Sequence, residues 1–294
     1  MKKILPGVAL ICLALISNAQ TTTLTPILYG EIDTADLKAA PYSEWYSTNF
    51  SGYSPDSNVI ARLSALKTSD VRIEIFLGTW CGDSKREVPR FLKVLQESRF
   101  PLQRVKMIGV GGGDSLQKQS PLHEEAGKGV FRVPVFIVYK KGVEINRINE
   151  FPILSLEKDL YSILTADAYA PNYRSFSLVR TWLSDGTLLD KNINHRGLAT
   201  QLRPLISGEN ELNSLGYLLQ AQGKTQEAHR IFLANAALYP ESANILSSLG
   251  ESHFRLGDRK NAVQLLEKAL ALTKDTLLSK DILAILYMVK SEER

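Results

Sequence analysis

The apolar residues between positions 71 and 110 occur first as a compact run, then at helical spacing, then as a second run. Val71–Leu77 and Val105–Val110 are short apolar runs rich in β-branched residues, which is typical of buried strands. From Val88 to Leu95 the apolar residues recur at i, i+3, i+4 and i+7, the spacing of an amphipathic helix. We therefore expect a strand, a helix and a strand, which is the beginning of a mixed α/β domain.

The pattern continues with four more predicted elements. Residues 121–130 predict a short helix. The runs Val133–Tyr139 and Val143–Ile148 flank a Lys-Lys-Gly turn, which predicts a β-hairpin. Apolar residues then recur with helical spacing from Leu156 to Leu164, so a helix closes the domain. The predicted order after residue 70 is β, α, β, α, β, β, α.

The segment before this domain divides into a leader and an extension. Lys2 and Lys3 are followed by an apolar run over residues 4–16 and by Ser17-Asn18-Ala19, the pattern of a secretory signal peptide over residues 1–19. The run is too short to span a bilayer. We expect export, a periplasmic or extracellular mature protein and no membrane insertion after cleavage, with a retained N-terminal anchor as the alternative.

Residues 20–59 predict an N-terminal extension whose aromatic side chains, including Trp45, pack onto the domain that follows. Asp56 is in the position of a helix N-cap, before apolar residues at helical spacing.

The second half of the chain contains an internal repeat with a period of 34 residues. The recurring pairs are Leu215 and Leu249, Gly216 and Gly250, Gly223 and Gly257, Ala228 and Ala262, and Phe232 and Leu266. This period resembles that of tetratricopeptide repeat (TPR) proteins, which are usually protein-binding scaffolds. We assign repeats to 209–242 and 243–276, with a capping helix over 277–290. Residues 168–208 are expected to be a linker with possible helices.

Side chains at six repeat positions that often face a concave ligand surface mix polar and aromatic character and indicate no ligand class. They are Asn213, Tyr217, Ser247, Glu251, Phe254 and Arg255.

Composition and charge exclude several classes of function. The formal net charge is +4, too small for the electrostatic footprint of a nucleic-acid-binding protein. The glycine-rich stretch 109–113 lacks the register of a phosphate-binding loop, and we interpret it as a flexible loop. No histidine or cysteine has metal-ligand spacing, so we expect no metal and no cofactor. Of the two cysteines, Cys12 lies in the predicted signal peptide and Cys81 is left in the mature chain.

Cys81 is the candidate for chemistry because it lies between a predicted buried strand and a helix. Backbone N–H groups and the dipole at a helix N-terminus stabilise a thiolate. Trp80-Cys81-Gly82-Asp83-Ser84-Lys85, with Pro89 after it and Val133-Pro134 before a strand, resembles the thioredoxin superfamily active site. The resemblance implies a thioredoxin-like fold over residues 60–167. The fold class is then an α/β thioredoxin-like domain followed by an all-α helical-repeat domain.

The resemblance also implies roles around the sulfur. Pro134 would be a cis-proline facing Cys81 that guides the backbone of a client protein. Trp80 would shield the sulfur, and Lys85 would favour the thiolate, whereas the charge of Asp83 opposes it.

Three departures from the family pattern change the expected chemistry. Ser84 stands where the family has its second cysteine, and Asp83 where it usually has proline. Ile75 stands where many members carry a buried acid. Neighbouring residues of a strand face opposite sides, so we do not expect Glu74 to replace that acid. A mixed disulfide at Cys81 could not be resolved by Ser84, because a hydroxyl is not a thiolate at neutral pH.

These observations leave two functions open. The first is thiol–disulfide exchange, or covalent capture, at the single thiol of Cys81, with the repeats recruiting disulfide-bearing client proteins. The second is a non-catalytic adaptor in which both domains only bind proteins or peptides. Whether the chain is an enzyme, and its oligomeric state, are not determined by the sequence.

Overall fold

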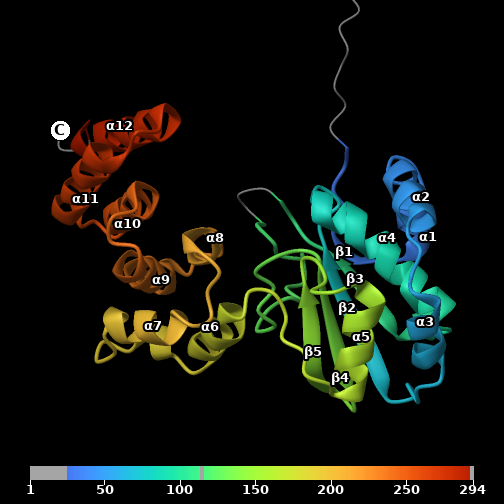
Figure 1. The fold of residues 1–294 in the computed structure, drawn as a ribbon. Coiled ribbons are helices and arrows are strands. Elements are labelled where there is room, and N and C mark those ends of the chain that lie inside the picture. Colours follow the sequence, from blue (N-terminus) through green and yellow to red (C-terminus); the bar gives the residue numbers. More distant parts are fainter. Residues whose placement is uncertain (1–24, 113–115, 292–294) are drawn as a thin grey trace, which may run out of the picture.

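The computed structural model describes residues 25–112 and 116–291, and the predicted signal peptide lies outside these ranges. A domain built on a β-sheet is followed by a domain of helices (Figure 1). The strands are β1 (Gly30–Ile32), β2 (Val71–Leu77), β3 (Val105–Gly109), β4 (Val135–Lys140) and β5 (Val143–Asn149). The helices of the first domain are α1 (Thr34–Lys38), α2 (Ser43–Gly52), α3 (Ser57–Ser64), α4 (Gly82–Glu97) and α5 (Leu156–Thr165).

The five strands form one mixed sheet in the order β1-β3-β2-β4-β5. β2 and β3 are parallel and are joined through α4, whereas β1, β4 and β5 pair antiparallel to their neighbours. The predicted extension is therefore part of the domain, because its strand β1 lies along the edge of β3. The predicted Lys-Lys-Gly hairpin joins β4 to β5.

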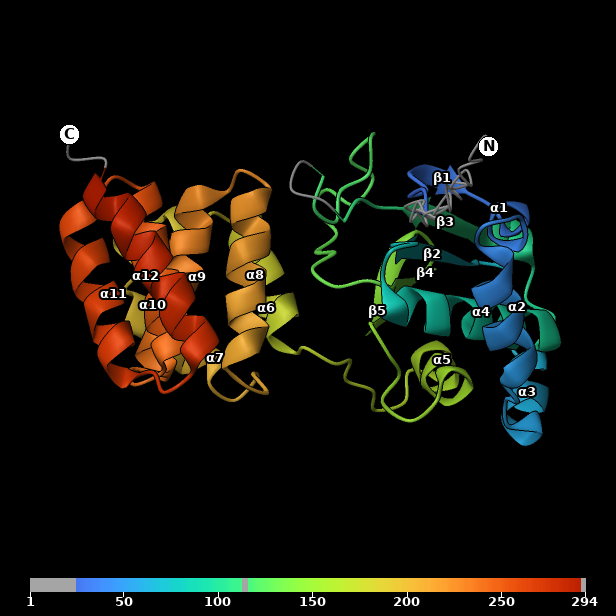
Figure 2. The same ribbon diagram turned by 90° about the horizontal axis from the view of Figure 1, so that it is seen from above.

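The helices cover one face of the sheet (Figure 2). Alternate residues of β2, from Val71 to Leu77, pack against apolar residues of α3, α4 and α5 in one buried cluster. Asp56 caps α3, as the sequence predicts, by accepting hydrogen bonds from the backbone of Asn58 and Val59. The aromatic residues of the extension, Tyr46 and Trp45 among them, pack on this cluster, which agrees with the predicted packing role.

The segment that covers the other face of the sheet differs from the prediction. Residues 121–130 are a series of turns and not a helix. His123, Gly127 and Gly129 have positive φ values there, which a continuous right-handed helix does not allow. This irregular segment between β3 and β4 lies over the second face, where Val130 and Val133 pack on Phe76 and Ile108.

Seven helices among the described residues form the second domain. They are α6 (Ser175–Ser184), α7 (His195–Leu202), α8 (Glu209–Ala221), α9 (Thr225–Leu238), α10 (Ala243–Arg255), α11 (Arg259–Leu272) and α12 (Thr276–Ser291). The predicted linker over 168–208 thus contains two helices, α6 and α7, which pack in the same apolar cluster as α8 and α9. No helix of the described chain is both long and apolar enough to cross a membrane.

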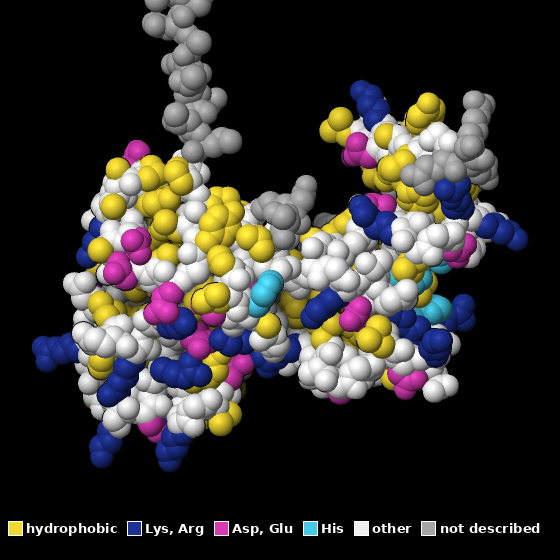
Figure 3. Space-filling model, turned by 180° about the vertical axis from the view of Figure 1, so that it is seen from behind, with side chains coloured by type: hydrophobic (Ala, Val, Ile, Leu, Met, Phe, Trp, Pro, Cys, Tyr) yellow, Lys and Arg dark blue, Asp and Glu magenta, His cyan; other side chains and the backbone are white. Residues whose placement is uncertain are grey.

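The repeat of 34 residues corresponds to a repeat of helix pairs, α8 with α9 and α10 with α11. A Cβ atom on Gly216 would lie 2.6 Å from the ring of Phe232, and one on Gly250 would lie 2.9 Å from Leu266. Glycine at these positions therefore allows the two helices of each pair to approach closely. α12 packs on α11 and leaves apolar side chains exposed, Leu277 and Tyr287 among them. Hydrophobic side chains gather at this end of the helical domain in Figure 3.

Candidate functional site

Cys81 is the N-cap residue of α4, directly after the loop that follows β2. Its thiol is free and partly exposed, and Sγ donates to the backbone carbonyl of Val133 at 3.2 Å. The peptide bond between Val133 and Pro134 is cis. The sulfur therefore lies between the start of a helix, where backbone N–H groups are unpaired, and the segment that enters β4.

Trp80 is held at the end of β3. Its Nε1 donates to the carbonyl of Val110 at 3.0 Å, and its ring leaves no room for a Cβ atom on Gly78 or Gly112. Gly109 is equally constrained, because a Cβ atom there would lie 2.3 Å from the carbonyl oxygen of Leu28. Close packing therefore explains these glycines of the 109–113 stretch without a bound phosphate.

Ser84 is fully buried inside the first turn of α4. Its Oγ accepts a hydrogen bond from the backbone N–H of Gly78 at 3.1 Å. The hydroxyl thus fixes the loop that carries Cys81. The sequence analysis, which noted only that Ser84 replaces a second cysteine, did not reveal this role.

We expect Ser84→Ala to lower the free energy of unfolding by about 1–2 kcal/mol, because the buried N–H of Gly78 loses its acceptor. Urea unfolding followed by circular dichroism measures this change. The matched control is Ser57→Ala, an exposed serine at the start of α3, with an expected change below about 0.5 kcal/mol. Equal effects of the two substitutions would contradict the role of Ser84.

The charges beside Cys81 are partly paired. Asp83 forms an ion pair with Arg86 at 2.5 Å, and Arg86 also contacts the buried Glu87. The Arg86 cation therefore offsets the charge of Asp83 at the start of α4. Lys85 has no ion pair among the described residues.

Lys118 and Arg132 also belong to this region, and the sequence analysis missed both. Burial lowers the pKa of Lys118, and the charge of Arg132 lowers it further, while Cys81 and Glu150 act in the opposite direction. Lys118 is thus a desolvated cation within electrostatic reach of the sulfur. Both cations lie in the irregular segment before β4, where no hydrophobic periodicity marks a residue's place.

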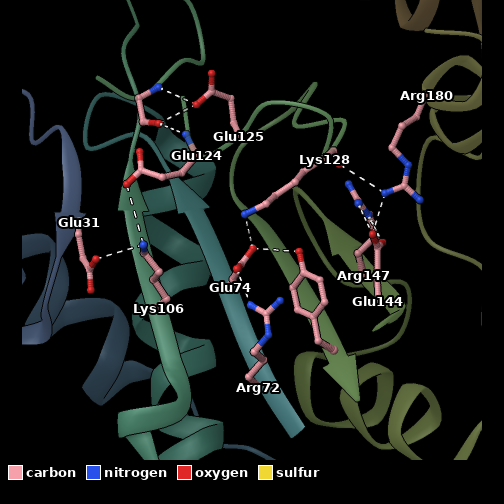
Figure 4. A network of polar contacts seen from close by, with 12 residues as sticks. Glu31, Arg72, Glu74, Lys106, Glu124, Glu125, Lys128, Glu144, Arg147 and Arg180 are labelled. Atoms are coloured by element: carbon pink, nitrogen blue, oxygen red, sulfur yellow. Dashed lines mark hydrogen bonds and ion pairs between the residues drawn. The ribbon is translucent and has the colours of Figure 1, made fainter. Parts of the chain in front are cut away.

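Ile75 is buried on the helix-covered face of the sheet, as its position in the sequence suggests. Glu74 lies on the opposite face and is also buried, which the prediction did not include. Its carboxylate accepts from Arg72 at 2.5 Å, from Lys128 at 2.7 Å and from the Tyr139 hydroxyl at 2.9 Å (Figure 4). These bonds hold the second sheet face together, and none of them reaches Cys81.

The two domains meet through direct contacts as well as through the segment 168–208 that joins them. Phe131 packs edge-on against Phe176 of α6, with ring centroids 5.2 Å apart. Arg180 of α6 forms an ion pair with Glu144 of β5 at 2.7 Å (Figure 4). Arg132, next to Val133, donates to Ser214 of α8 at 2.7 Å. Arg132 therefore links helix α8 to the residue next to Val133, whose carbonyl contacts the sulfur.

The six predicted concave residues do not form one open surface. Asn213 and Ser247 are buried. The Tyr217 hydroxyl bonds to Ser248 and Glu251, each at 3.1 Å. Arg255 pairs with Glu251 at 2.9 Å. Many of the polar groups of these side chains thus already form hydrogen bonds or ion pairs within the domain.

Two histidines, His229 of α9 and His253 of α10, contact each other. The rings of His229 and His253 are 4.6 Å apart and perpendicular. Burial, together with the charge of His253, lowers the pKa of His229 to about 4. In the described part of the chain, no group of three or more His, Cys, Asp or Glu residues is arranged to hold a metal ion.

Comparison with known proteins identifies one of the helix pairs. Among solved structures, the chain is similar to PcrH in complex with the chaperone binding region of PopD, with 19% sequence identity and a TM-score of 0.29. That similarity covers 40% of this chain and 90% of the other. No curated protein matches the chain. The tetratricopeptide repeat family model matches residues 242–280, which include α10 and α11. This segment is a tetratricopeptide repeat.

Proposed function

We propose that this protein is a protein-binding scaffold whose helical domain recruits a segment of another protein. The observation that carries the proposal is the tetratricopeptide repeat at 242–280, preceded by a helix pair, α8 and α9, with the same close glycine contact. Stacked helix pairs of this kind form extended surfaces that bind peptides and proteins. The basic start and apolar run of the sequence support a location outside the cytoplasm.

A second candidate function is favoured by the position of Cys81. The thiol is partly exposed, begins a helix and has a desolvated cation, Lys118, within electrostatic reach. The order of β2, α4, β3, β4, β5 and α5 also supports a thioredoxin-like domain. In this function the Cys81 thiolate attacks a client disulfide, forms a mixed disulfide and releases one client thiolate. A thiol from outside the chain then resolves the adduct.

Affinity capture distinguishes the two functions. We expect wild type and Cys81→Ala to retain the same proteins in equal yield in the presence of reductant, because the repeats bind without a covalent bond. Without reductant, bands that disappear on adding dithiothreitol and are absent from Cys81→Ala would support the thiol function. A wild-type column that retains nothing above a bare column in reductant would falsify the scaffold.

We expect insulin reduction by the wild type, with dithiothreitol as the reductant, to stay near background, since Ser84 cannot resolve a mixed disulfide. Ser84→Cys should raise the rate, because it places a second thiol one helical turn from Cys81. The matched control, Ser57→Cys, adds a thiol to the start of α3 and should not raise the rate. Strong wild-type activity would contradict the single-thiol mechanism.

A further inference from the structure

A groove of about 530 Å³ lies in the helical domain between α7, α9, α10 and α11. Its apolar lining includes Leu233, Ala236, Ala237, Leu246, Leu249 and Leu265. None of its lining residues comes from α8, and none of the six predicted concave residues lines it. The groove is therefore a different surface from the one that the repeat pattern suggested.

The edge of this groove is basic. His195, Arg196 and Arg203 line it from the α7 side, and Lys268 lines it from α11. Arg196 lies in the first turn of α7 and Arg203 is the C-cap residue directly after it, about two turns away, and both are exposed. Neither guanidinium has a hydrogen bond or an ion pair within the described chain, so both charges remain available to a ligand.

One acid offsets a single cation of this edge. Glu241 pairs with Lys268 at 3.4 Å, but both side chains are well exposed, and such pairs exchange readily with solvent. His195 lies next to Arg196 on this edge of the groove. Burial lowers its pKa, and the charges of Arg230 and Arg196 lower it further.

The combination of an apolar floor and unpaired cations defines the ligand. Apolar side chains are needed to cover the leucines and alanines, and carboxylates are needed to meet the arginines. An amphipathic helix that lays its apolar face into a groove between helices supplies both groups. We propose that this groove binds a short amphipathic protein segment rich in Asp and Glu. The proposal rests on the scaffold function and specifies the surface and the chemistry of the partner.

Binding of designed peptides to the full-length protein tests this proposal. The probes are two fluorescein-labelled helical peptides of about 18 residues, each with leucines at i, i+3, i+4 and i+7. One carries glutamates at the remaining positions and the other carries lysines. Fluorescence anisotropy should show binding of the acidic peptide, at least about tenfold tighter than that of the basic peptide.

Substitutions then locate the site. Arg196→Glu combined with Arg203→Glu should raise the Kd for the acidic peptide at least about tenfold. Ala237→Gln, on the apolar floor, should raise the Kd for the acidic peptide at least about fivefold, because it places a polar side chain where a leucine of the peptide would be buried. The matched control is Lys274→Glu with Lys280→Glu, two exposed lysines of the same domain that do not line the groove. This control should change the Kd less than about twofold. Thermal unfolding verifies that each variant is folded.

Three results would overturn the proposal. The first is that the acidic peptide does not bind at about 100 µM protein. The second is that the groove and control double variants weaken its binding equally. The third is that the groove variants leave its Kd unchanged. Binding of anionic phospholipid vesicles that depends on Arg196 and Arg203, without binding of the peptide, would assign the groove to a membrane surface instead. If the peptide fails to bind but reductant-treated Cys81→Ala still retains proteins, the groove proposal is wrong and the scaffold stands. If both experiments fail, neither proposal holds.

Discussion

Replacing Gly216 by valine is expected to lower the free energy of unfolding by about 3 kcal/mol. The first added carbon would lie 2.6 Å from the ring of Phe232, which is fully buried and packs edge-on against Tyr217. The ring has no free space to move into, so α8 and α9 must separate. This loss is large compared with the 5–15 kcal/mol that typically stabilises a domain. Urea unfolding followed by far-ultraviolet circular dichroism measures the change.

Gly197→Val is the matched control for this substitution. Gly197 lies in α7, and a Cβ atom there would meet no other atom within 4 Å. The same side chain should therefore change the stability by less than about 0.5 kcal/mol. If the two valine variants unfold at the same urea concentration, α8 and α9 do not pack as closely as the structure shows.

Glu74→Leu should destabilise the protein by about 3 kcal/mol. Burial alone would raise the pKa of Glu74, but hydrogen bonds from Lys128, Arg72 and Tyr139 outweigh it and leave the pKa below its ordinary value of 4.5. Leucine removes the carboxylate and leaves these donors without an acceptor on the second sheet face. The stability of the variant, measured by urea unfolding at pH 7, tests the expected loss.

The pH dependence gives an independent check on Glu74. Because its pKa is lower in the folded than in the unfolded state, the carboxylate stabilises the fold above pH 4.5, and this contribution is lost as the pH falls below that value. The difference between wild type and Glu74→Leu should therefore shrink at acidic pH. Glu31→Gln is the control, because Glu31 pairs with Lys106 while its side chain is 69% exposed, and its effect should stay below about 1 kcal/mol. A constant difference between wild type and Glu74→Leu from pH 7 to pH 3 would contradict the assigned ionisation.

The elements that the sequence predicted correctly are those with a strong periodic pattern. The strands β2 and β3, the helix α4 and the hairpin of β4 and β5 each have an apolar face of the expected spacing. The helix pairs of the repeat were predictable because the same glycine and alanine positions recur after 34 residues. Such local patterns predict an element correctly because the folded element buries the apolar face that its sequence provides.

The segment between β3 and β4 could not be predicted in the same way. Its course is determined by residues with positive φ values, such as His123, and by contacts with distant parts of the chain. Lys128 reaches Glu74, and Arg132 reaches Ser214, across 54 and 82 residues of sequence. No local pattern encodes these pairs. The helix predicted over 121–130 was therefore wrong, and the surroundings of Cys81 were incompletely described.

The same limit applies to Ser84 and to the helical groove. The motif around Cys81 indicated chemistry at position 84, but only the fold reveals that the Ser84 hydroxyl accepts a hydrogen bond from the backbone N–H of Gly78. The groove brings Arg196 and Lys268 together from α7 and α11, which are far apart in sequence. Repeat periodicity indicates which residues are equivalent, but it does not indicate which helices enclose a cavity.

Phe131 has a thermodynamic consequence for the whole chain. This residue comes from the sheet domain but lies in the apolar cluster of the helical domain, whereas its close neighbours Val130 and Val133 pack on the sheet. Unfolding of either domain alone would expose the side chain of Phe131 to water and remove a fixed point from the segment beside Cys81. The two domains therefore share part of their stability, and the order of the thiol site depends on the integrity of the repeats.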